Sequence, residues 1–195
     1  MGLYDRQEGL GLKRNISITI VGVGGIGFHV AKFAAMSGIE KIYLFDPDLI
    51  EENNLNRLDL PESSVGKNKA AVTREVINSI RPECTVYSLP FVLQEHTYTK
   101  TDWMIDCTDN LKSQMTNQEI AKKFGSRYMK AGYNGESITI ADTVAEWGEA
   151  PDGYTVIPSW VVPATIVAAL TIAKVMKYDN FEISTEIKRL FNYKK

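Results

Sequence analysis

The chain has 195 residues, of which 44% are hydrophobic and 24% charged, and its formal net charge is −2 at pH 7. This composition is typical of a globular domain with a sizeable core and excludes a disordered chain. The charge balance gives no basis for binding nucleic acid or an anionic membrane. No secretory signal pattern opens the sequence, so we expect a cytoplasmic protein.

The first predicted elements are a strand over residues 16–21 and a helix over residues 26–36. The strand is β-branched and apolar, as a buried parallel strand should be. Between them, Gly22, Gly24 and Gly27 match the G-x-G-x-x-G spacing. Glycines allow a tight turn and a close approach of backbone N–H groups to a phosphate, and the helix N-terminus adds partial positive charge. The pattern predicts a nucleotide-binding loop.

A second strand is predicted over residues 41–45, and Asp46 follows at its carboxyl end in Asp46-Pro47-Asp48. A carboxylate at this place can bind ribose hydroxyls. A glycine fingerprint alone is weak, but one set between two strands with the acid in place is a strong signal. It predicts a Rossmann-like start.

The remaining elements alternate between strands and helices, with a polar loop over residues 51–64 first. We predict a helix over 68–79, strands over 85–89 and 103–105, a helix over 111–124, strands over 127–131 and 137–143, and a helix from about Pro163. This order predicts an α/β fold: a Rossmann-like, mainly parallel sheet with helices on both faces and a short antiparallel extension in the second half. The apolar run over 156–176 contains two prolines and a lysine, so it is expected to be a buried helix and not a membrane span.

Three charged residues follow predicted strands or turns and could serve a nucleotide. Arg57, in a loop beyond the second strand, could fork two phosphate oxygens, although a solvated loop arginine would look the same. Lys69 stands at a predicted helix start, where an anionic ligand or mere surface exposure would explain it. Asp109, just past a central strand, could hold Mg²⁺ beside a triphosphate or simply cap the next helix.

These residues together resemble the ThiF and MoeB family of ATP-dependent adenylating enzymes, which includes the ubiquitin-activating enzymes. The resemblance runs from Tyr4 to about Thr143. Its motifs are Tyr4-Asp5-Arg6-Gln7, the glycine loop, Asp46-Pro47-Asp48, Asn54-Leu55-Asn56-Arg57, Val65-Gly66-Lys67-Asn68-Lys69-Ala70 and Asp106-Cys107-Thr108-Asp109-Asn110. So many positions at the family's spacings make a chance match improbable.

The resemblance implies a role for each of these residues. It implies ATP and Mg²⁺ as cofactors, a carboxylate acceptor and a homodimer in which Arg6 enters the partner subunit's site. The acceptor would be the C-terminus of a ubiquitin-like or sulfur-carrier protein, or a peptide. Catalysis would rest on Arg57, Lys69, Asp109 and Arg6, with Asp109 as the Mg²⁺ ligand. ATP would be bound by Gly22, Gly24, Gly25, Gly27, Asp46, Asp48, Asn54, Arg57 and Lys69.

The chain also departs from the family's usual pattern. Leu58 stands where a glutamine usually follows the arginine, and the Cys-x-x-Cys pairs that hold zinc in many members are absent, so we expect no zinc. No cysteine follows Cys107, and neither Cys107 nor Cys84 has a basic neighbour in sequence that would lower its pKa. We therefore expect both to be structural, and any thiol for later steps to come from another protein.

We expect a single adenylation domain over residues 1–195, with a nucleotide-binding half over about 1–125 and an acceptor and dimer half over about 126–195. The loop over 148–160 is expected to line the acceptor groove. Two other readings stay open: a non-catalytic partner subunit or nucleotide-binding scaffold of the same fold, and an NAD-dependent oxidoreductase. The sequence does not identify the acceptor or the pathway.

Overall fold

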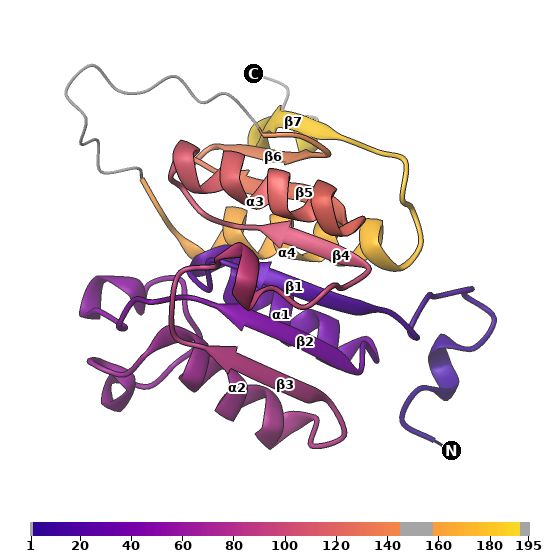
Figure 1. Ribbon diagram of the computed structural model, residues 1–195, viewed down its shortest axis with the longest axis horizontal. Coiled ribbons are helices and arrows are strands. Elements are labelled where there is room, and N and C mark those ends of the chain that lie inside the picture. Colours follow the sequence, from indigo (N-terminus) through magenta and orange to yellow (C-terminus); the bar gives the residue numbers. More distant parts are fainter. Residues whose placement is uncertain (1, 145–157, 192–195) are drawn as a thin grey trace.

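The computed structural model describes residues 2–144 and 158–191. Its centre is a seven-stranded sheet in the order β3-β2-β1-β4-β5-β6-β7 (Figure 1). The first five strands of this order are parallel to one another, β6 pairs antiparallel with β5, and β7 pairs antiparallel with β6. The strands are β1 (Ser17–Val21), β2 (Lys41–Phe45), β3 (Thr85–Leu89), β4 (Trp103–Asp106), β5 (Arg127–Tyr133), β6 (Ser137–Ala141) and β7 (Ile183–Glu186).

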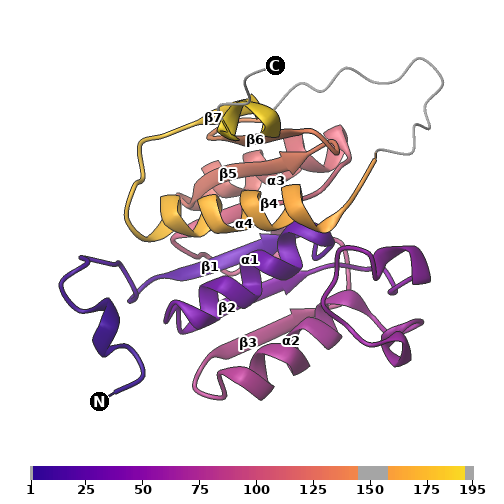
Figure 2. The same ribbon diagram turned by 180° about the vertical axis from the view of Figure 1, so that it is seen from behind.

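Helices cover both faces of the sheet. On one face, α1 (Gly25–Met36) packs between α2 (Lys69–Ile80) and α4 (Val161–Met176), as Figure 2 shows. On the other face, α3 (Leu111–Phe124) lies against β4 and β5 (Figure 1). Residues Ile18 and Ile20 of β1 are fully buried, because the central strand has neighbours on every side. The predicted α/β class with an antiparallel extension is confirmed.

The order of the strands creates a switch point beside β1. The chain leaves β1 toward β2 and β3 and then returns to place β4 on the other side of β1. At such a reversal the loops that leave two neighbouring strands diverge and open a crevice at the carboxyl edge of the sheet. The glycine loop follows β1 and the segment that contains Asp109 follows β4, so both lie at this crevice.

Most element boundaries agree with those predicted, and the differences are local. β2, β3 and α3 have the predicted bounds, whereas β5 extends to Tyr133 and β6 ends at Ala141. The predicted loop over 51–64 contains two short 3₁₀ helices, Glu52–Asn54 and Glu62–Ser64. β7 was not predicted, because its four residues are too few to show a clear alternation of polar and apolar side chains. The strand is defined by its pairing with β6.

The apolar helix predicted from about Pro163 is α4, which begins at Val161 and is buried against α1 and β5. No helix among the described residues is long and apolar enough to cross a membrane. The loop predicted over 148–160 lies largely outside the described residues, which resume at position 158.

Candidate active site

The glycine loop is shaped by contacts that leave no room for side chains at two positions. Gly22 has φ +84°, and a Cβ atom there would lie 3.1 Å from the backbone of Cys107 and Thr108. A Cβ atom on Gly27 would lie 2.0 Å from the Gly22 carbonyl oxygen. Gly24 is different, since it is the N-cap residue of α1 and a Cβ atom there would meet nothing within 4 Å. The N-terminus of α1 therefore faces open space at Gly24, as a phosphate site requires.

Arg57 lies over the first turn of α1. A Cβ atom on Gly25 would be 3.0 Å from Cδ of Arg57 and 3.1 Å from the hydroxyl of Tyr133. The guanidinium Nη1 donates to the Asn53 carbonyl oxygen at 2.8 Å and to Oδ1 of Asn56 at 2.9 Å. Each of these bonds uses the same end of a group with five N–H donors, so others remain available for phosphate oxygens.

His29, in the second turn of α1, holds the backbone of Arg57. Its Nε2 lies 3.0 Å from the Arg57 carbonyl oxygen, and because a carbonyl only accepts, Nε2 donates. The ring is buried, and this burial lowers the pKa of His29 below 6.5. Next to Arg57, Leu58 is buried in the apolar core, so it packs where the family's glutamine would offer polar atoms.

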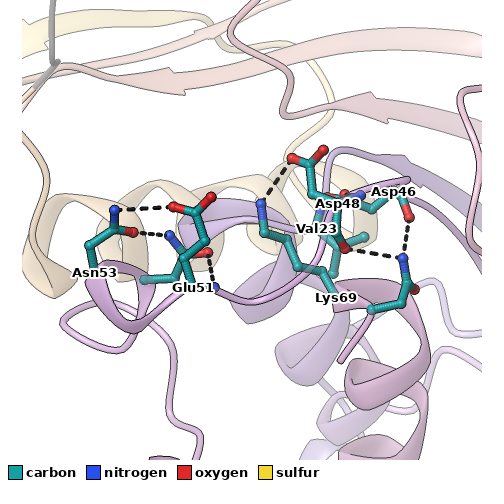
Figure 3. Close-up of polar contacts among 8 residues, drawn as sticks. Val23, Asp46, Asp48, Glu51, Asn53 and Lys69 are labelled. Atoms are coloured by element: carbon teal, nitrogen blue, oxygen red, sulfur yellow. Dashed lines mark hydrogen bonds and ion pairs between the residues drawn. The ribbon is translucent and has the colours of Figure 1, made fainter. Parts of the chain in front are cut away.

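Asp46 connects the end of β2 to the glycine loop. Its Oδ2 accepts from the Val23 N–H at 2.6 Å and its Oδ1 accepts from the Asp48 N–H at 2.8 Å (Figure 3). Burial raises the pKa of Asp46, while the two N–H donors oppose that rise. A carboxylate accepts more than two hydrogen bonds, so Asp46 can hold the loop and still accept from ribose hydroxyls.

Lys69 and Asp48, both predicted as ligand-binding residues, form an ion pair. The Nζ atom of Lys69 lies 3.0 Å from Oδ2 of Asp48 (Figure 3). The lysine side chain is 14% exposed and that of the aspartate 64% exposed, so the cation is sheltered at the start of α2 and the anion faces solvent. A phosphate that arrived here could replace Asp48 as the partner of Lys69.

Asn68 was not singled out in the sequence, yet it joins these segments. Its Nδ2 donates to the carbonyl oxygens of Asp46 and Asp48 at 2.9 and 3.1 Å, and its Oδ1 accepts from the Ala71 N–H as the N-cap of α2. Asn54 also has a structural contact: it is buried and forms a capping box with Glu51 around the 3₁₀ helix Glu52–Asn54. Asn54 therefore shapes the loop that carries Arg57.

Asp109 is left to face the crevice. The alternative role as the helix cap is wrong, because the side chain of Asn110 accepts from the Ser113 N–H and caps α3. Asp109 is exposed, and its carboxylate has no hydrogen-bond or ion-pair partner within residues 2–144 and 158–191. Across those residues no cluster of three or more His, Cys, Asp or Glu side chains could hold a metal ion. One carboxylate together with substrate phosphates is, however, a common way to bind Mg²⁺.

Arg6 is not brought to the same place. It lies in a short 3₁₀ helix, Asp5–Gln7, and the neighbouring Tyr4 donates its hydroxyl to Glu83 at 3.1 Å and to the Ala35 carbonyl at 3.4 Å. These partners lie at the end of α1 and before β3, near the amino edge of the sheet. Figure 1 shows the N-terminal segment on the side away from the strand arrowheads.

Neither cysteine lies in surroundings that would activate its thiol. The thiol of Cys84 donates to the Ile39 carbonyl oxygen, and burial raises the pKa of that thiol to about 11. Burial also raises the pKa of Cys107 to about 12. Because the thiolate is the nucleophile, neither cysteine is prepared for thioester chemistry at neutral pH.

A parallel sheet with a glycine loop, an acid after the second strand and basic residues at the switch point is the architecture typical of nucleotide-binding proteins of the Rossmann type. The particular family follows from comparison with known proteins. The ThiF family model matches residues 5–147, so the chain belongs to the ThiF family.

Three of the similar proteins are informative. Ubiquitin-like modifier-activating enzyme 5 of Dictyostelium discoideum is 28% identical over 155 residues, covering 71% of this chain and 40% of the relative. The tRNA threonylcarbamoyladenosine dehydratase of Bacillus subtilis is 35% identical over 111 residues, covering 54% and 44%. The crystal structure of E. coli MccB with AMPCPP and MccA superposes with a TM-score of 0.79 at 23% identity, covering 90% of this chain and 61% of that one. This likeness shows the fold, and the chain spans less than half of the two relatives' length.

Proposed function

We propose that this chain catalyses the ATP- and Mg²⁺-dependent adenylation of a carboxylate, giving an acyl-adenylate and pyrophosphate. The observation that carries the proposal is that four features meet at one switch point: the open N-terminus of α1, Arg57, Lys69, and Asp109, which does not serve as the cap of α3. An NAD-dependent oxidoreductase would use the glycine loop and Asp46 but would give Arg57, Lys69 and Asp109 no task. The triphosphate of ATP needs such charges.

In the proposed reaction the acceptor carboxylate attacks the α-phosphorus of ATP. A new bond forms between the carboxylate oxygen and the α-phosphorus, the bond between the α-phosphorus and the bridging oxygen breaks, and pyrophosphate leaves with that electron pair. No general base is needed, because the nucleophile is already ionised. Positioning and neutralisation of charge by the chain's own groups supply the catalysis.

Each residue has a part in this scheme. The N–H groups from Gly22 to Gly27 line the phosphates, with Gly24 and Gly25 nearest the open end, and Asp46 accepts from the ribose. Arg57 and Lys69 spread positive charge over the phosphate oxygens, and Lys69 exchanges its contact with Asp48 for them. Asp109 would hold Mg²⁺, which would supply positive charge to the leaving pyrophosphate.

The acceptor in this proposal is the C-terminus of a ubiquitin-like or sulfur-carrier protein, or a short peptide. The names of the relatives support these classes, since one is a ubiquitin-like modifier-activating enzyme and the MccB structure contains MccA. The reaction would end at the adenylate in this chain, because the thiols of Cys84 and Cys107 have raised pKa values. A second protein or an amine would then take the acyl group.

The first test is thermal unfolding with Mg-ATP, matched against NAD⁺ and NADH. A ligand at about a hundred times its Kd adds roughly 2.7 kcal/mol, which raises the Tm of a domain of this size by about 5–10 °C. We expect that rise with Mg-ATP alone. A rise with NAD⁺ or NADH alone would replace the proposal with a redox or regulatory one. ATP–pyrophosphate exchange with candidate carboxylates then separates an active enzyme from a nucleotide-binding scaffold.

We further propose a homodimer in which Arg6 completes the partner subunit's site. The distance of the N-terminal segment from the carboxyl edge of its own sheet supports this, since Arg6 could serve no phosphate there. Mixing Arg6→Ala with Asp109→Ala chains should restore part of the exchange activity, because some mixed dimers would contain one site with both residues intact. No recovery in mixtures that do form heterodimers would show that each site is complete within one chain.

A further inference from the structure

Lys130 is a buried cation that contacts the end of β4 and the turn before Asp109. It lies on β5, in register with Asp106 of β4, and the residue is 3% exposed. Its Nζ donates to the carbonyl oxygens of Thr108 at 2.5 Å, Ala131 at 3.2 Å and Asp106 at 3.4 Å. No carboxylate lies within ion-pair distance of Lys130 among the described residues. A buried cation that has only carbonyl partners is costly for stability alone.

Two of the three carbonyls belong to the turn that joins β4 to Asp109. The same turn is held from other sides, since Asp106 accepts from the N–H and hydroxyl of Thr108 at 2.9 and 2.6 Å. Oδ2 of Asp106 accepts from Asn117 at 2.9 Å and from the Tyr128 hydroxyl at 3.0 Å. Side chains of α3 and β5 therefore fix the turn, and the next residue, Asp109, has no side-chain hydrogen bond or ion pair in the part of the chain that the structure describes.

We propose that Lys130 is a positioning residue. Its ammonium donates to the Asp106 and Thr108 carbonyl oxygens, and this contact orients the Asp109 carboxylate toward the phosphate-bound Mg²⁺. This inference rests on the proposed function for the metal step. Burial lowers the pKa of Lys130, and the charge of Asp109 is among those that oppose the change, which agrees with their closeness. A residue that orients a metal ligand typically affects metal affinity or activity about 10- to 100-fold.

The chain offers a matched control in a second buried lysine. Lys174 of α4 is fully buried, donates to the Phe181 carbonyl oxygen and pairs with Asp142 at 2.8 Å. Asp142 follows β6, which runs antiparallel to β5 and so ends at the amino edge of the sheet, away from the crevice. Replacing either lysine by methionine removes a buried ammonium and keeps most of the stem, so both variants should lose stability.

The test compares Lys130→Met with Lys174→Met by two readouts that need no acceptor. The first is the Kd for ATP by calorimetry, with Mg²⁺ and with EDTA. We expect Lys130→Met to raise the Kd about 10- to 100-fold with Mg²⁺ and to leave it within about twofold in EDTA. The second is hydrogen exchange of the amides of Cys107 and Thr108, which should be faster in Lys130→Met alone. Lys174→Met should change neither readout.

Equal effects of the two substitutions, or unchanged values in Lys130→Met, would overturn the inference and leave Lys130 a structural residue. If Lys130→Met does not fold, Lys130→Gln decides, because its amide reaches fewer carbonyls: a weaker Mg²⁺-dependent Kd supports the inference and an unchanged one overturns it. A wild-type chain that binds ATP no better with Mg²⁺ than in EDTA would contradict the proposed function instead. The hydrogen-exchange comparison would still decide whether Lys130 holds the turn.

Discussion

Charged residues at the two edges of the sheet differ in how they are paired. At the amino edge, Asp179 accepts from Lys13 at 3.0 Å and from Arg127 at 3.2 Å, and the Arg127 guanidinium lies 3.9 Å from the centre of the Trp103 ring. At the carboxyl edge, Asp109 has no described partner and Lys69 is paired only with a solvent-exposed aspartate. The amino-edge charges are paired with one another, whereas at the carboxyl edge Asp109 is exposed and Lys69 has a solvent-exposed partner that a ligand could replace.

The difference shows where this fold places stability and where it places chemistry. Exposed ion pairs such as those at the amino edge stabilise a protein only slightly, so their role is to attach the N-terminal segment and the start of β5. Groups at the carboxyl edge are instead held by neutral contacts, as His29 holds Arg57 and Asn68 holds the turn after Asp46. Because these neutral groups bond to backbone carbonyls, they hold the chain beside Arg57 and Asp46 without occupying the charged side chains themselves.

The largest effect should follow from Gly24→Val, which tests whether the open N-terminus of α1 is the phosphate site. A Cβ atom at Gly24 would meet no protein atom within 4 Å, so we expect the fold to stay intact. The valine would nevertheless occupy the approach of the phosphates, and we expect the Tm rise with Mg-ATP to disappear. Gly27→Ala is the contrasting variant: its Cβ atom would lie 2.0 Å from the Gly22 oxygen, so it should lower the Tm of the free protein, which Gly24→Val should not. Such overpacking costs about 1–3 kcal/mol. An undiminished Mg-ATP response in Gly24→Val would place the nucleotide elsewhere.

A second effect should follow from Asp109→Ala, which removes a carboxylate that makes no hydrogen bond or ion pair among the described residues. Because Asn110 and not Asp109 caps α3, the Tm of the free protein should change by less than about 2 °C. The rate of ATP–pyrophosphate exchange should fall by about 100-fold or more, as expected for a group that stabilises charge in the transition state. Undiminished exchange would remove the metal role, and a large loss of Tm would show that Asp109 is a structural residue.

The sequence predicted the glycine loop and the elements around it well because their signals are local. The glycines are required by contacts within a few residues of one another or across one strand pair, so their spacing alone reveals the loop. The acid after β2 follows from the same pattern. Arg57, Lys69 and Asp109 stood out from their places after predicted strands and turns, and the family resemblance then implied a role for each; that they lie near one another depends on a topology that the alternation of strands and helices already implied.

The supports of the site could not be predicted in the same way. The bond of His29 to the Arg57 carbonyl joins residues 28 positions apart, and it depends on the path of an irregular loop. Lys130 has the pattern of an ordinary strand residue until β4 and β5 are paired. The choice between Asp109 and Asn110 as the cap of α3 turns on a shift of one residue, which sequence preferences do not resolve. These features need the three-dimensional structure.

A third, smaller effect concerns pH and the neutral support of Arg57. Burial depresses the pKa of His29 in the folded state below its usual 6.5, so the unfolded chain binds a proton that the folded chain does not. The stability from the neutral ring is present above pH 6.5 and is lost as the pH falls below it. His29→Gln keeps an N–H donor for the Arg57 carbonyl but does not titrate. We expect the Tm to fall less between pH 7.5 and 5.5 in His29→Gln than in the wild type; parallel Tm curves would contradict the assignment.

The smallest effect should come from Lys13→Ala at the amino edge, and a small effect there would support the difference between the two edges of the sheet. The side chain of Lys13 is 53% exposed and Asp179 keeps Arg127 as a partner, so the lost attraction is screened by solvent and partly replaced. We expect the Tm to change by less than about 3 °C and the Kd for Mg-ATP to stay within about twofold. Asp179→Ala, which removes both bonds, is the stronger variant for the same measurement. If either substitution weakened ATP binding as much as a change at the carboxyl edge, the two edges would be coupled, and the division between a stabilising edge and a reactive edge would be wrong.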